Sequence, residues 1–474
     1  MTDKAILWFR QDLRLTDNPA LIAAVQAGAI LPIYILEEDA GADAMGAASR
    51  TWLHHSLAAL NNALGGHLQF FKGKAEAILT DLCDQNAITC VHWNRAYEPW
   101  RMARDRAIKA ALTAKGIAVA SHKANLLWEP WEALKSDGTP YKVFTPFYRR
   151  GCLSATPPRR PLAAPQSYDF IAPAKQSLSL DDLCLTAPLP WSDQIMAGWQ
   201  AGEDGAVKRL SVFLDEGIDH YSEGRNLPAK AYVSRLSPHL HFGEISPNSC
   251  WYAALDRFGM EHKGCDVFLS ELGWREFSHS LLYYNHDLKT TPLNQKFAKF
   301  PWRKSETDLQ KWQKGMTGYP IVDAGMRELY QTGYMHNRVR MIVGSFLVKN
   351  LRLPWQEGEK WFWDCLCDAS HASNTASWQW IAGCGADAAP YFRVFNPITQ
   401  AEKFDPDGSY IKKYVPELQD LPAKYIGAPF QAPEEVLQKA GIILGKTYPH
   451  PIVDAKQSRL DALAAFATLK EVAS

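Results

Sequence analysis

The sequence predicts an α/β N-terminal part with a doubly wound parallel sheet, followed by an all-α C-terminal part. Short apolar runs alternate with helical patterns at first, and strand signals nearly vanish after Trp199. A stretch rich in Pro, Ala and Ser separates the two parts. We therefore expect an α/β domain over 1–130, an interdomain linker over 131–200 and a helical domain over 201–474.

Five apolar runs in the first part have the length and composition of buried strands. They cover residues 5–10, 30–36, 68–73, 88–94 and 117–122. Helix-like segments such as ALIAAVQAG lie between them, and this alternation implies a parallel sheet wound in both directions. The first turn, RQDLRLTDN, has no G-x-G-x-x-G and no Walker pattern. The sheet therefore carries no ordinary dinucleotide fingerprint.

The connecting stretch and the second part have different patterns. Residues of about 150–200 are expected to form a long connector that runs over the surface. Helical periodicity then follows, punctuated by Gly and Pro. The periodic segments cover residues 205–224, 268–284, 321–333, 337–351, 358–369 and 460–469.

Composition excludes several classes of protein. The chain has 474 residues and a formal net charge of zero, so nucleic-acid binding requires a local basic patch. Its nine cysteines form no C-x-x-C pair, which predicts a reducing, intracellular (cytoplasmic) setting and no metal site. Charged side chains occur too close to the first residue for the apolar run of a signal peptide. No apolar run has the roughly 20 residues of a membrane span. The 17 tryptophans are suited to core packing, to stacking and to electron transfer.

Two segments combine hydroxyl, charged and aromatic side chains. In YVSRLSPHLHF, the turn Ser234–Ser237 offers hydroxyls and a cation to a phosphate, or is an ordinary helix cap. The nearby His239 and His241 have no third ligand and favour a structural role. In SELGWREF, Glu271, Trp274 and Arg275 share one helix face. They fit either a polar ring system or a half-buried ion pair beside a packed indole.

Two later segments raise similar alternatives. GYMHNRVRM contains Arg338 and Arg340, which are two residues apart and point to different sites: one fits a backbone phosphate and the other an internal carboxylate such as Asp368. A solvated basic face is the plainer interpretation. NTASWQW puts Trp378 and Trp380 two residues apart, behind small residues that let a flat molecule approach the backbone. A core tryptophan pair explains neither the spacing nor the small residues.

Together these segments resemble the photolyase/cryptochrome flavoprotein family, and most closely the microbial cyclobutane pyrimidine dimer DNA photolyases. The resemblance covers nearly the whole chain and rests on the segments WFRQDLRLTDN, YKVFTPF, SRLSPHL, WREF, TGYPIVDAGMR, GYMHNRVRM and DAAPYFRVFNP.

The resemblance implies FAD bound in the helical domain, with Arg340 paired to Asp368 and Asn374 opposite flavin N5. The residues expected to bind it are Tyr221, Val233, Ser234, Arg235, Leu236, Ser237, Phe268, Arg275, Asn337, Arg340, Asp368, Ala369, Ser370 and Asn374. An amide at position 374 favours repair, since plant cryptochromes carry Asp there. Three positions depart from the family pattern: Val233 replaces a hydroxyl residue, Ser370 an Asp, and Thr375-Ala376-Ser377 an Asn-Gly-Gly.

The resemblance also implies light-driven repair of DNA, in which excited reduced flavin passes an electron to a flipped-out dimer. Trp302, Trp355 and Trp378 match the relay that reduces the flavin, and with Asn374 and Glu271 they form the expected catalytic set. Extruding the bases costs a few kcal/mol, which stacking at roughly 1–3 kcal/mol per base nearly offsets. The expected DNA contacts are Arg225, Glu271, Trp274, Asn337, Arg338, Met341, Trp380, Arg393 and Gln400.

Two questions stay open at this level. The segment YEPWRMARD has Trp100 and Arg101 where folate-binding members have Asn-Glu, and its Glu-Pro-aromatic pattern resembles deazaflavin-binding members. An antenna chromophore, of the deazaflavin or the folate type, is therefore left undecided. The alternative function is a cryptochrome-type blue-light sensor with the same flavin and relay. We expect a monomer that acts on UV-damaged DNA and does not enter the membrane; a (6-4) photolyase is disfavoured because His336-Asn337 lacks the second histidine.

Overall fold

The computed structural model describes residues 3–37, 44–187, 190–388 and 392–471. They form two compact units, each of which is discontinuous in sequence. The first unit comprises residues 1–216, 234–286 and 367–372, and the second comprises residues 217–233, 287–366 and 373–474. The sequence domains with expected boundaries near 130 and 200 are a different division of the chain and stay a prediction.

The first unit contains a five-stranded parallel sheet, as expected. Its strands are β1 (Asp3–Phe9), β2 (Gly28–Leu36), β3 (Gln69–Lys72), β4 (Cys90–Asn94) and β5 (Ala118–His122). They lie in the order β3-β2-β1-β4-β5, with Ile6 of β1 opposite Leu31 of β2 and Val91 of β4. The chain thus winds outward from β1 in both directions, which confirms the doubly wound topology. No further strand occurs in the part of the chain that the structure describes.

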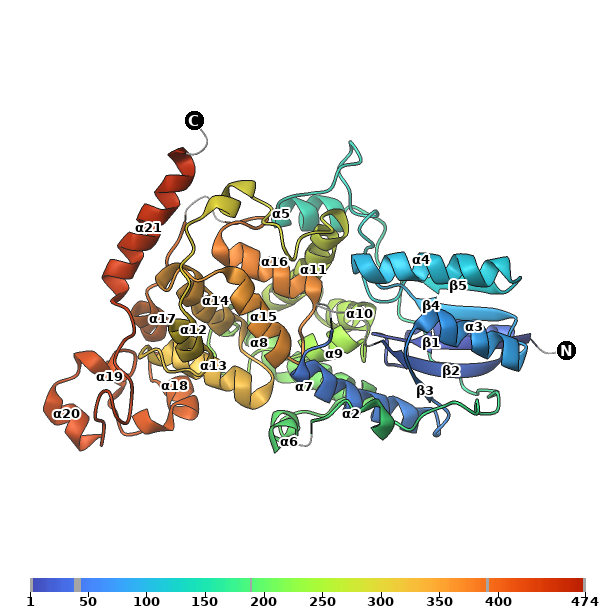
Figure 1. The fold of residues 1–474 in the computed structure, drawn as a ribbon, viewed down its shortest axis with the longest axis horizontal. Helices are drawn as coiled ribbons and strands as arrows, with labels where there is room; N and C mark the ends of the chain where they lie inside the picture. Colours follow the sequence, from blue (N-terminus) through green and yellow to red (C-terminus); the bar gives the residue numbers. More distant parts are fainter. Residues whose placement is uncertain (1–2, 38–43, 188–189, 389–391, 472–474) are drawn as a thin grey trace. The chain divides into compact units, whose positions relative to one another are not determined.

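Helices cover both faces of the sheet. Their bounds are α1 (Pro19–Ala27), α2 (Ala47–Ala63), α3 (Ala75–Asn86) and α4 (Pro99–Ala114). Because side chains alternate along a strand, Leu7 of β1 joins the core beneath α1 and α2, whereas Trp8 joins the core beneath α3 and α4. Figure 1 shows α2 and the pair α3 and α4 on opposite faces. Burial on both faces explains why the strands are apolar without alternation.

The stretch over 131–200, expected to be a linker that runs over the surface in its later part, is mostly exposed or partly exposed, although some of its residues are buried. It contains α5 (Phe144–Pro146), a π-helix η2 (Phe147–Cys152), η3 (Asp181–Leu183) and α6 (Pro190–Met196). Phe170 forms a bridge with Ile30 of β2, and Leu183 and Leu185 are buried in the sheet core. Pro-rich composition marked the irregular backbone correctly, but isolated apolar residues within it tie the segment to the sheet.

Helices account for most of the rest of the chain. In the first unit these are α7 (Glu203–Val212), α9 (Ser237–Phe242), α10 (Pro247–Phe258) and α11 (Lys263–Tyr284). In the second unit the longer ones are α8 (Ile218–Gly224), α12 (Glu306–Gln313), α13 (Pro320–Thr332), α14 (Asn337–Ser345) with η6 (Phe346–Asn350), α15 (Trp355–Cys365), α17 (Pro397–Phe404), α18 (Ser409–Tyr414), α20 (Glu434–Lys439) and α21 (Ala455–Glu471). Helix α16 (His371–Ala382) begins in the first unit and continues in the second.

Helix α13 is the centre of the second unit. It begins at Pro320, whose fixed φ suits a first helical position, and ends at Gly333, which takes the left-handed φ of 63°. It packs against α14, α17 and α18, and Ile321 and Val322 are fully buried. The all-α character expected for this part is confirmed. No helix among the described residues is both long and apolar enough to cross a membrane.

Candidate functional site

The predicted phosphate turn lies in the first unit. Arg235 has a φ of 51°, a left-handed conformation that costs free energy for a residue with a side chain and that occurs often at ligand sites. Its guanidinium lies 4.3 Å over the ring of Trp199. The Leu236 N–H donates to the Ser234 hydroxyl at 3.5 Å, and Ser237 begins α9. The turn therefore combines strained backbone, hydroxyls and a cation, which suits a phosphate group.

The two histidines beyond this turn, His239 and His241, have protein partners of their own. His239 is fully buried and its Nδ1 is bonded to Glu244, which also accepts from the Trp52 indole at 3.0 Å. Burial lowers the pKa of His241 to about 4, even though the carboxylate of Asp368 raises it. No group of three metal-binding side chains occurs among the described residues.

Helix α11 presents Glu271, Trp274 and Arg275, all partly exposed. The Trp274 ring stacks on Phe144, with centroids 3.8 Å apart and planes at 11°. Arg275 donates to the carbonyl of Asn125 at 2.6 Å and thus ties α11 to the loop after β5.

Three further predicted cofactor residues also lie in the first unit. Phe268 packs on Phe213 at 4.9 Å, Ala369 is buried and Ser370 is partly exposed. Asp368 lies in this unit and Arg340 in the second, so their expected pairing stays a prediction.

The second unit contains a basic cluster of Arg225, Arg338 and Arg340 around His336. Burial, followed by these three cations, lowers the pKa of His336 to about 3. The Nδ1 of His336 accepts the Arg338 N–H at 3.2 Å, so its Nε2 carries the proton. This Nε2 is buried and has no hydrogen-bond partner among the described residues. A neutral donor within a positive cluster fits an anionic ligand that has acceptor atoms.

The remaining residues of this region surround the cluster. Arg338 donates to the Asn226 side chain at 2.5 Å, and Arg225 lies 5.7 Å over the ring of Tyr221. Asn337 is exposed at the start of α14, with Met341 one turn further along. Val233 is partly exposed in the second unit. The structure therefore brings Arg225, Arg338 and Arg340 together. Arg225 is far from the other two in the sequence, and the two-residue spacing of Arg338 and Arg340 had indicated different sites for them.

Helix α16 is held by two consecutive residues of α15. The Asn374 amide donates to the carbonyl of Glu359 at 3.0 Å, and the Thr375 hydroxyl donates to the Glu359 carboxylate at 3.2 Å. The Trp378 ring lies so close to Gly358 that a Cβ there would overlap it. The departure from Asn-Gly-Gly at Thr375 therefore has a physical account, a hydrogen bond to a buried carboxylate. Nothing in the structure explains Ala376 or Ser377.

The three relay tryptophans differ in exposure. Trp302 is partly exposed and packs on Phe300 at 4.4 Å, whereas Trp355 and Trp378 are 2% and 3% exposed. This order is the one that a path from solvent to a buried acceptor requires. Trp378 also packs edge-to-face on Trp312, at 6.2 Å, a residue that sequence reasoning missed.

The remaining predicted DNA contacts lie at the C-terminal side of α16. The Trp380 indole donates to the carbonyl of Asp387 at 3.1 Å and its ring stays partly exposed. Arg393 is exposed, and Gln400 is partly exposed on α17.

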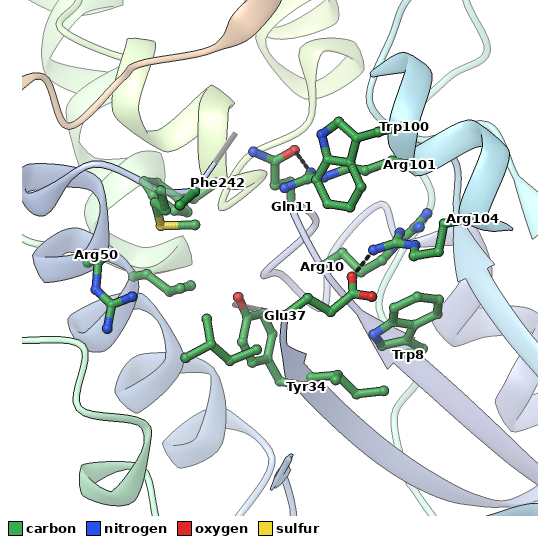
Figure 2. A pocket seen from close by; sticks show the side chains of 15 residues that line it. Trp8, Arg10, Gln11, Tyr34, Glu37, Arg50, Trp100, Arg101, Arg104 and Phe242 are labelled. Atoms are coloured by element: carbon green, nitrogen blue, oxygen red, sulfur yellow. Dashed lines mark hydrogen bonds and ion pairs between the residues drawn. The ribbon is translucent and has the colours of Figure 1, made fainter. Parts of the chain in front are cut away.

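A cavity of about 290 Å³ lies within the first unit, where β1 and β2 end. Figure 2 shows Trp8 and Tyr34 from the strands, Arg10 and Glu37 directly after them, and Trp100, Arg101 and Arg104 from α4 around it. The ends of parallel strands are where such sheets bind ligands. The indole N–H groups of Trp8 and Trp100 are buried and have no partner among the described residues. The cavity therefore offers aromatic rings, cations and two unused donors to a planar ligand with acceptor atoms.

Sequence reasoning noticed Trp100 and Arg101 but did not find this cavity. Its walls come from the strands β1 and β2, the helices α2, α4 and α9, and the loops that follow the strands, and these are far apart in the sequence. The only available signal was that Arg10 and Glu37 directly follow apolar strands.

Comparison with known proteins agrees with this geometry. Residues 5–166 match the family model described as DNA photolyase, and residues 268–468 match the FAD binding domain of DNA photolyase. A deoxyribodipyrimidine photo-lyase from Agrobacterium fabrum is 48% identical, over 99% of each chain. The Escherichia coli deoxyribodipyrimidine photo-lyase is 36% identical, over 97% of this chain and 98% of its own. Cryptochrome-1 of Arabidopsis thaliana is 38% identical, over 96% of this chain and 69% of its own.

Solved structures agree as well. A class III photolyase from Agrobacterium tumefaciens superposes with a TM-score of 0.95 at 47% identity, covering 99% of this chain and 98% of its own. A photolyase from Sulfolobus tokodaii with two FAD molecules has a TM-score of 0.81 at 30% identity, covering 98% and 100%. The fold and the site define a photolyase-type flavoprotein. The chain belongs to the DNA photolyase family, and its C-terminal part is the FAD-binding domain.

Proposed function

We propose that the chain is a deoxyribodipyrimidine photo-lyase, a carbon–carbon lyase that uses light to split cyclobutane pyrimidine dimers in DNA. The observation that carries this proposal is the α11 face with Glu271 and Trp274, in a chain similar over its whole length to photo-lyases. In the reaction the two bonds joining the pyrimidines break and the transferred electron returns, so there is no net oxidation or reduction.

FAD is the cofactor, and the residues present fit it. The Arg235 turn and Tyr221 would hold its phosphates and their flanks, and Arg340, Asn337 and Asp368 would line its ring system and ribityl chain. The partnerless His336 Nε2 and the surrounding cations support an anionic ligand there. When bound, FAD supplies the light absorption and the transferable electron. Asn374, held on α15, would present an uncharged amide to the flavin.

The protein contributes position, charge and a path for electrons. Trp302, Trp355 and Trp378 would carry electrons inward, because indole is readily oxidised and only Trp302 is partly exposed, whereas the other two are buried. Glu271 would hydrogen-bond the dimer, and Trp274 and Trp380 would stack on it. Arg225, Arg338 and Arg393 would contact phosphates, which carry no sequence information but provide affinity.

The cavity at the ends of β1 and β2 is the proposed site of an antenna chromophore. Its two unused indole donors and its arginines support a planar, acceptor-rich, anionic molecule. Both the deazaflavin and the folate type meet this description. An absorption spectrum of the purified protein tests this proposal, because a second chromophore adds a band to those of FAD. Trp100→Ala should remove that band and leave the FAD bands unchanged.

One experiment tests the main proposal. Purified protein with its flavin reduced is mixed with dimer-containing DNA, in blue or near-UV light and in darkness. We expect the dimers to disappear only in the light. Absent repair, or repair that proceeds in darkness, contradicts the proposal. We further propose an intracellular monomer, in keeping with the nine cysteines, which form no disulfide among the described residues and of which all but Cys184 are buried.

A further inference from the structure

We propose that Phe144 is a positioning residue that fixes the lesion-stacking face of Trp274. The inference rests on the proposed role of Trp274 in binding the dimer. Phe144 belongs to the stretch over 131–200 that the sequence predicted to be an interdomain linker.

The Phe144 ring stacks on one face of the Trp274 indole. The centroids are 3.8 Å apart and the planes deviate by 11°, which is a close, nearly parallel stack. Phe144 is 8% exposed, whereas Trp274 stays partly exposed. The accessible part of the indole is therefore its opposite face and its edge. A base that stacked on Trp274 would continue a column of rings that already contains Phe144.

A second ring prevents the indole from sliding. Phe277, one turn along α11, meets Trp274 edge-to-face at 5.9 Å and 73°, and it meets Phe144 at 6.0 Å and 64°. One parallel and one perpendicular neighbour together define both the plane and the in-plane position of the indole. A platform whose orientation is fixed before binding loses little conformational freedom when the ligand arrives.

The support extends behind Phe144. The Tyr148 ring lies parallel to Phe144, at 5.7 Å and 6°, one helical turn further along α5 and η2. Tyr148 also packs on the backbone of Gly273, where an added Cβ would come within 2.5 Å of the ring atom Cδ2. Gly273 therefore permits η2 to lie close to α11, immediately before Trp274 in sequence. The residues Tyr148, Phe144 and Trp274 form a stack anchored at a glycine.

The test uses the holoprotein and the variants Phe144→Leu, Phe144→Tyr and Trp274→Ala. Leucine fills much of the volume but has no flat face, so the indole loses its parallel neighbour. We expect Phe144→Leu to raise the Kd for dimer-containing DNA roughly 2- to 10-fold, the worth of one aromatic pair. The Kd for the same DNA without the dimer, the FAD content and the rate of photoreduction should not change. Phe144→Tyr, which keeps the flat ring, should restore the original Kd.

A ¹⁹F NMR measurement reports the position of the Trp274 indole independently of its binding to DNA. In protein labelled with 5-fluorotryptophan, the ¹⁹F resonance of Trp274, assigned through its loss in Trp274→Ala, should shift or broaden in Phe144→Leu without DNA. Phe170→Leu is the matched control, because Phe170 stacks on His67 at 4.0 Å and 9° elsewhere in the first unit. It should leave both the resonance and the Kd unchanged. If Phe144→Leu does not fold, Gly273→Ala should displace Tyr148 and Phe144 and produce the same changes.

An unchanged Trp274 resonance together with an unchanged Kd for dimer DNA in Phe144→Leu overturns the inference. Equal weakening for damaged and undamaged DNA also overturns it. If Trp274→Ala leaves selectivity intact while Phe144→Leu still shifts the resonance, the positioning stands and the proposed role of Trp274 in lesion binding fails.

Discussion

The Lys349 ammonium donates a hydrogen bond of 2.5 Å to the backbone carbonyl of Arg393. Lys349 is 6% exposed and also lies 4.9 Å over the ring of Phe392. One turn earlier, the Ser345 hydroxyl accepts the N–H of Phe395 at 3.4 Å. Ser345, at the end of α14, and Lys349, in the π-helix η6, thus hold the backbone around Arg393. We expect this exposed arginine to contact the DNA phosphates.

The burial of Lys349 predicts a distinct pH profile. Burial, followed by the charge of Arg393, lowers its pKa from 10.5 to about 8. The unfolded chain therefore binds more protons than the native protein between pH 8 and 10.5, and stability from this group rises with pH across that interval. The difference corresponds to on the order of 3 kcal/mol. Equilibrium denaturation of Lys349→Met should lack this rise, whereas the exposed-site control Lys446→Met should retain it.

Glu276 predicts a profile at lower pH. Burial raises the pKa of Glu276 from 4.5 to about 7, although Arg275 and the N–H of Trp128 lower it. The native protein then binds the extra proton between pH 4.5 and 7, so stability from this group falls as pH rises through that interval. Glu276→Gln keeps an acceptor for the Trp128 N–H and should lose this fall, measured by denaturation at pH 5 and pH 8. The exposed control Glu402→Gln should behave as the parent protein does, and an identical profile for both variants would contradict the assignment.

Arg393 should act on DNA through charge alone. Arg393→Gln is expected to weaken binding of damaged and undamaged DNA equally. A lost phosphate contact lowers the slope of log K against log salt by about 0.9. Titrations at several salt concentrations measure this slope. A loss confined to damaged DNA would mean that Arg393 reads the lesion.

Trp302 should matter for reducing the flavin but not for repair. Trp302→Phe replaces the most exposed indole of the relay with a ring that is much harder to oxidise. Photoreduction, followed by absorption of the flavin, should slow strongly. Repair by chemically pre-reduced protein should be unaffected, and a loss of both activities would show that the relay is assigned wrongly.

Trp380 should discriminate damaged from undamaged DNA. Trp380→Ala removes a stacking surface worth roughly 1–3 kcal/mol, so the Kd for dimer DNA should rise about 5- to 150-fold. Binding of undamaged DNA should change little, because an intact base stays in the duplex. The matched control is Trp131→Ala, which removes an indole that is 43% exposed in the first unit. Equal losses for both DNAs in Trp380→Ala would argue against a stacking role.

The sequence predicted the fold well where one pattern governs a whole element. The runs of β1 and β2 are continuously apolar because these strands are largely buried, whereas the edge strand β5 is only partly buried and was found from its position in the strand–helix alternation. The shared face of Glu271, Trp274 and Arg275 followed from helical spacing alone. The basic cluster was harder, because Arg225 and Arg338 are brought together by tertiary structure, in which Arg338 bonds the side chain of Asn226, and no local pattern encodes this.

Other features were out of reach for physical reasons. Phe144 lies in a stretch whose neighbours resemble a linker, and its importance arises from a helix more than a hundred residues away. A lysine in an apolar helix is usually expected at the surface, yet Lys349, in the π-helix η6, is buried and bonds the carbonyl of Arg393. The cavity beside Trp8 is assembled from two strands, three helices and the loops between them, so only tertiary structure reveals it.

Helix α15 holds both members of the predicted flavin-proximal pair at adjacent positions: Glu359 bonds Asn374, and Gly358 lies against Trp378. The Asn374 amide, which is expected to tune the cofactor, and the Trp378 indole, which is expected to deliver its electron, thus both contact the same turn of α15. A displacement of α15 would carry both together and leave their spacing unchanged. If the two side chains have these roles, a change in α15 that alters electron delivery should also alter the tuning of the flavin.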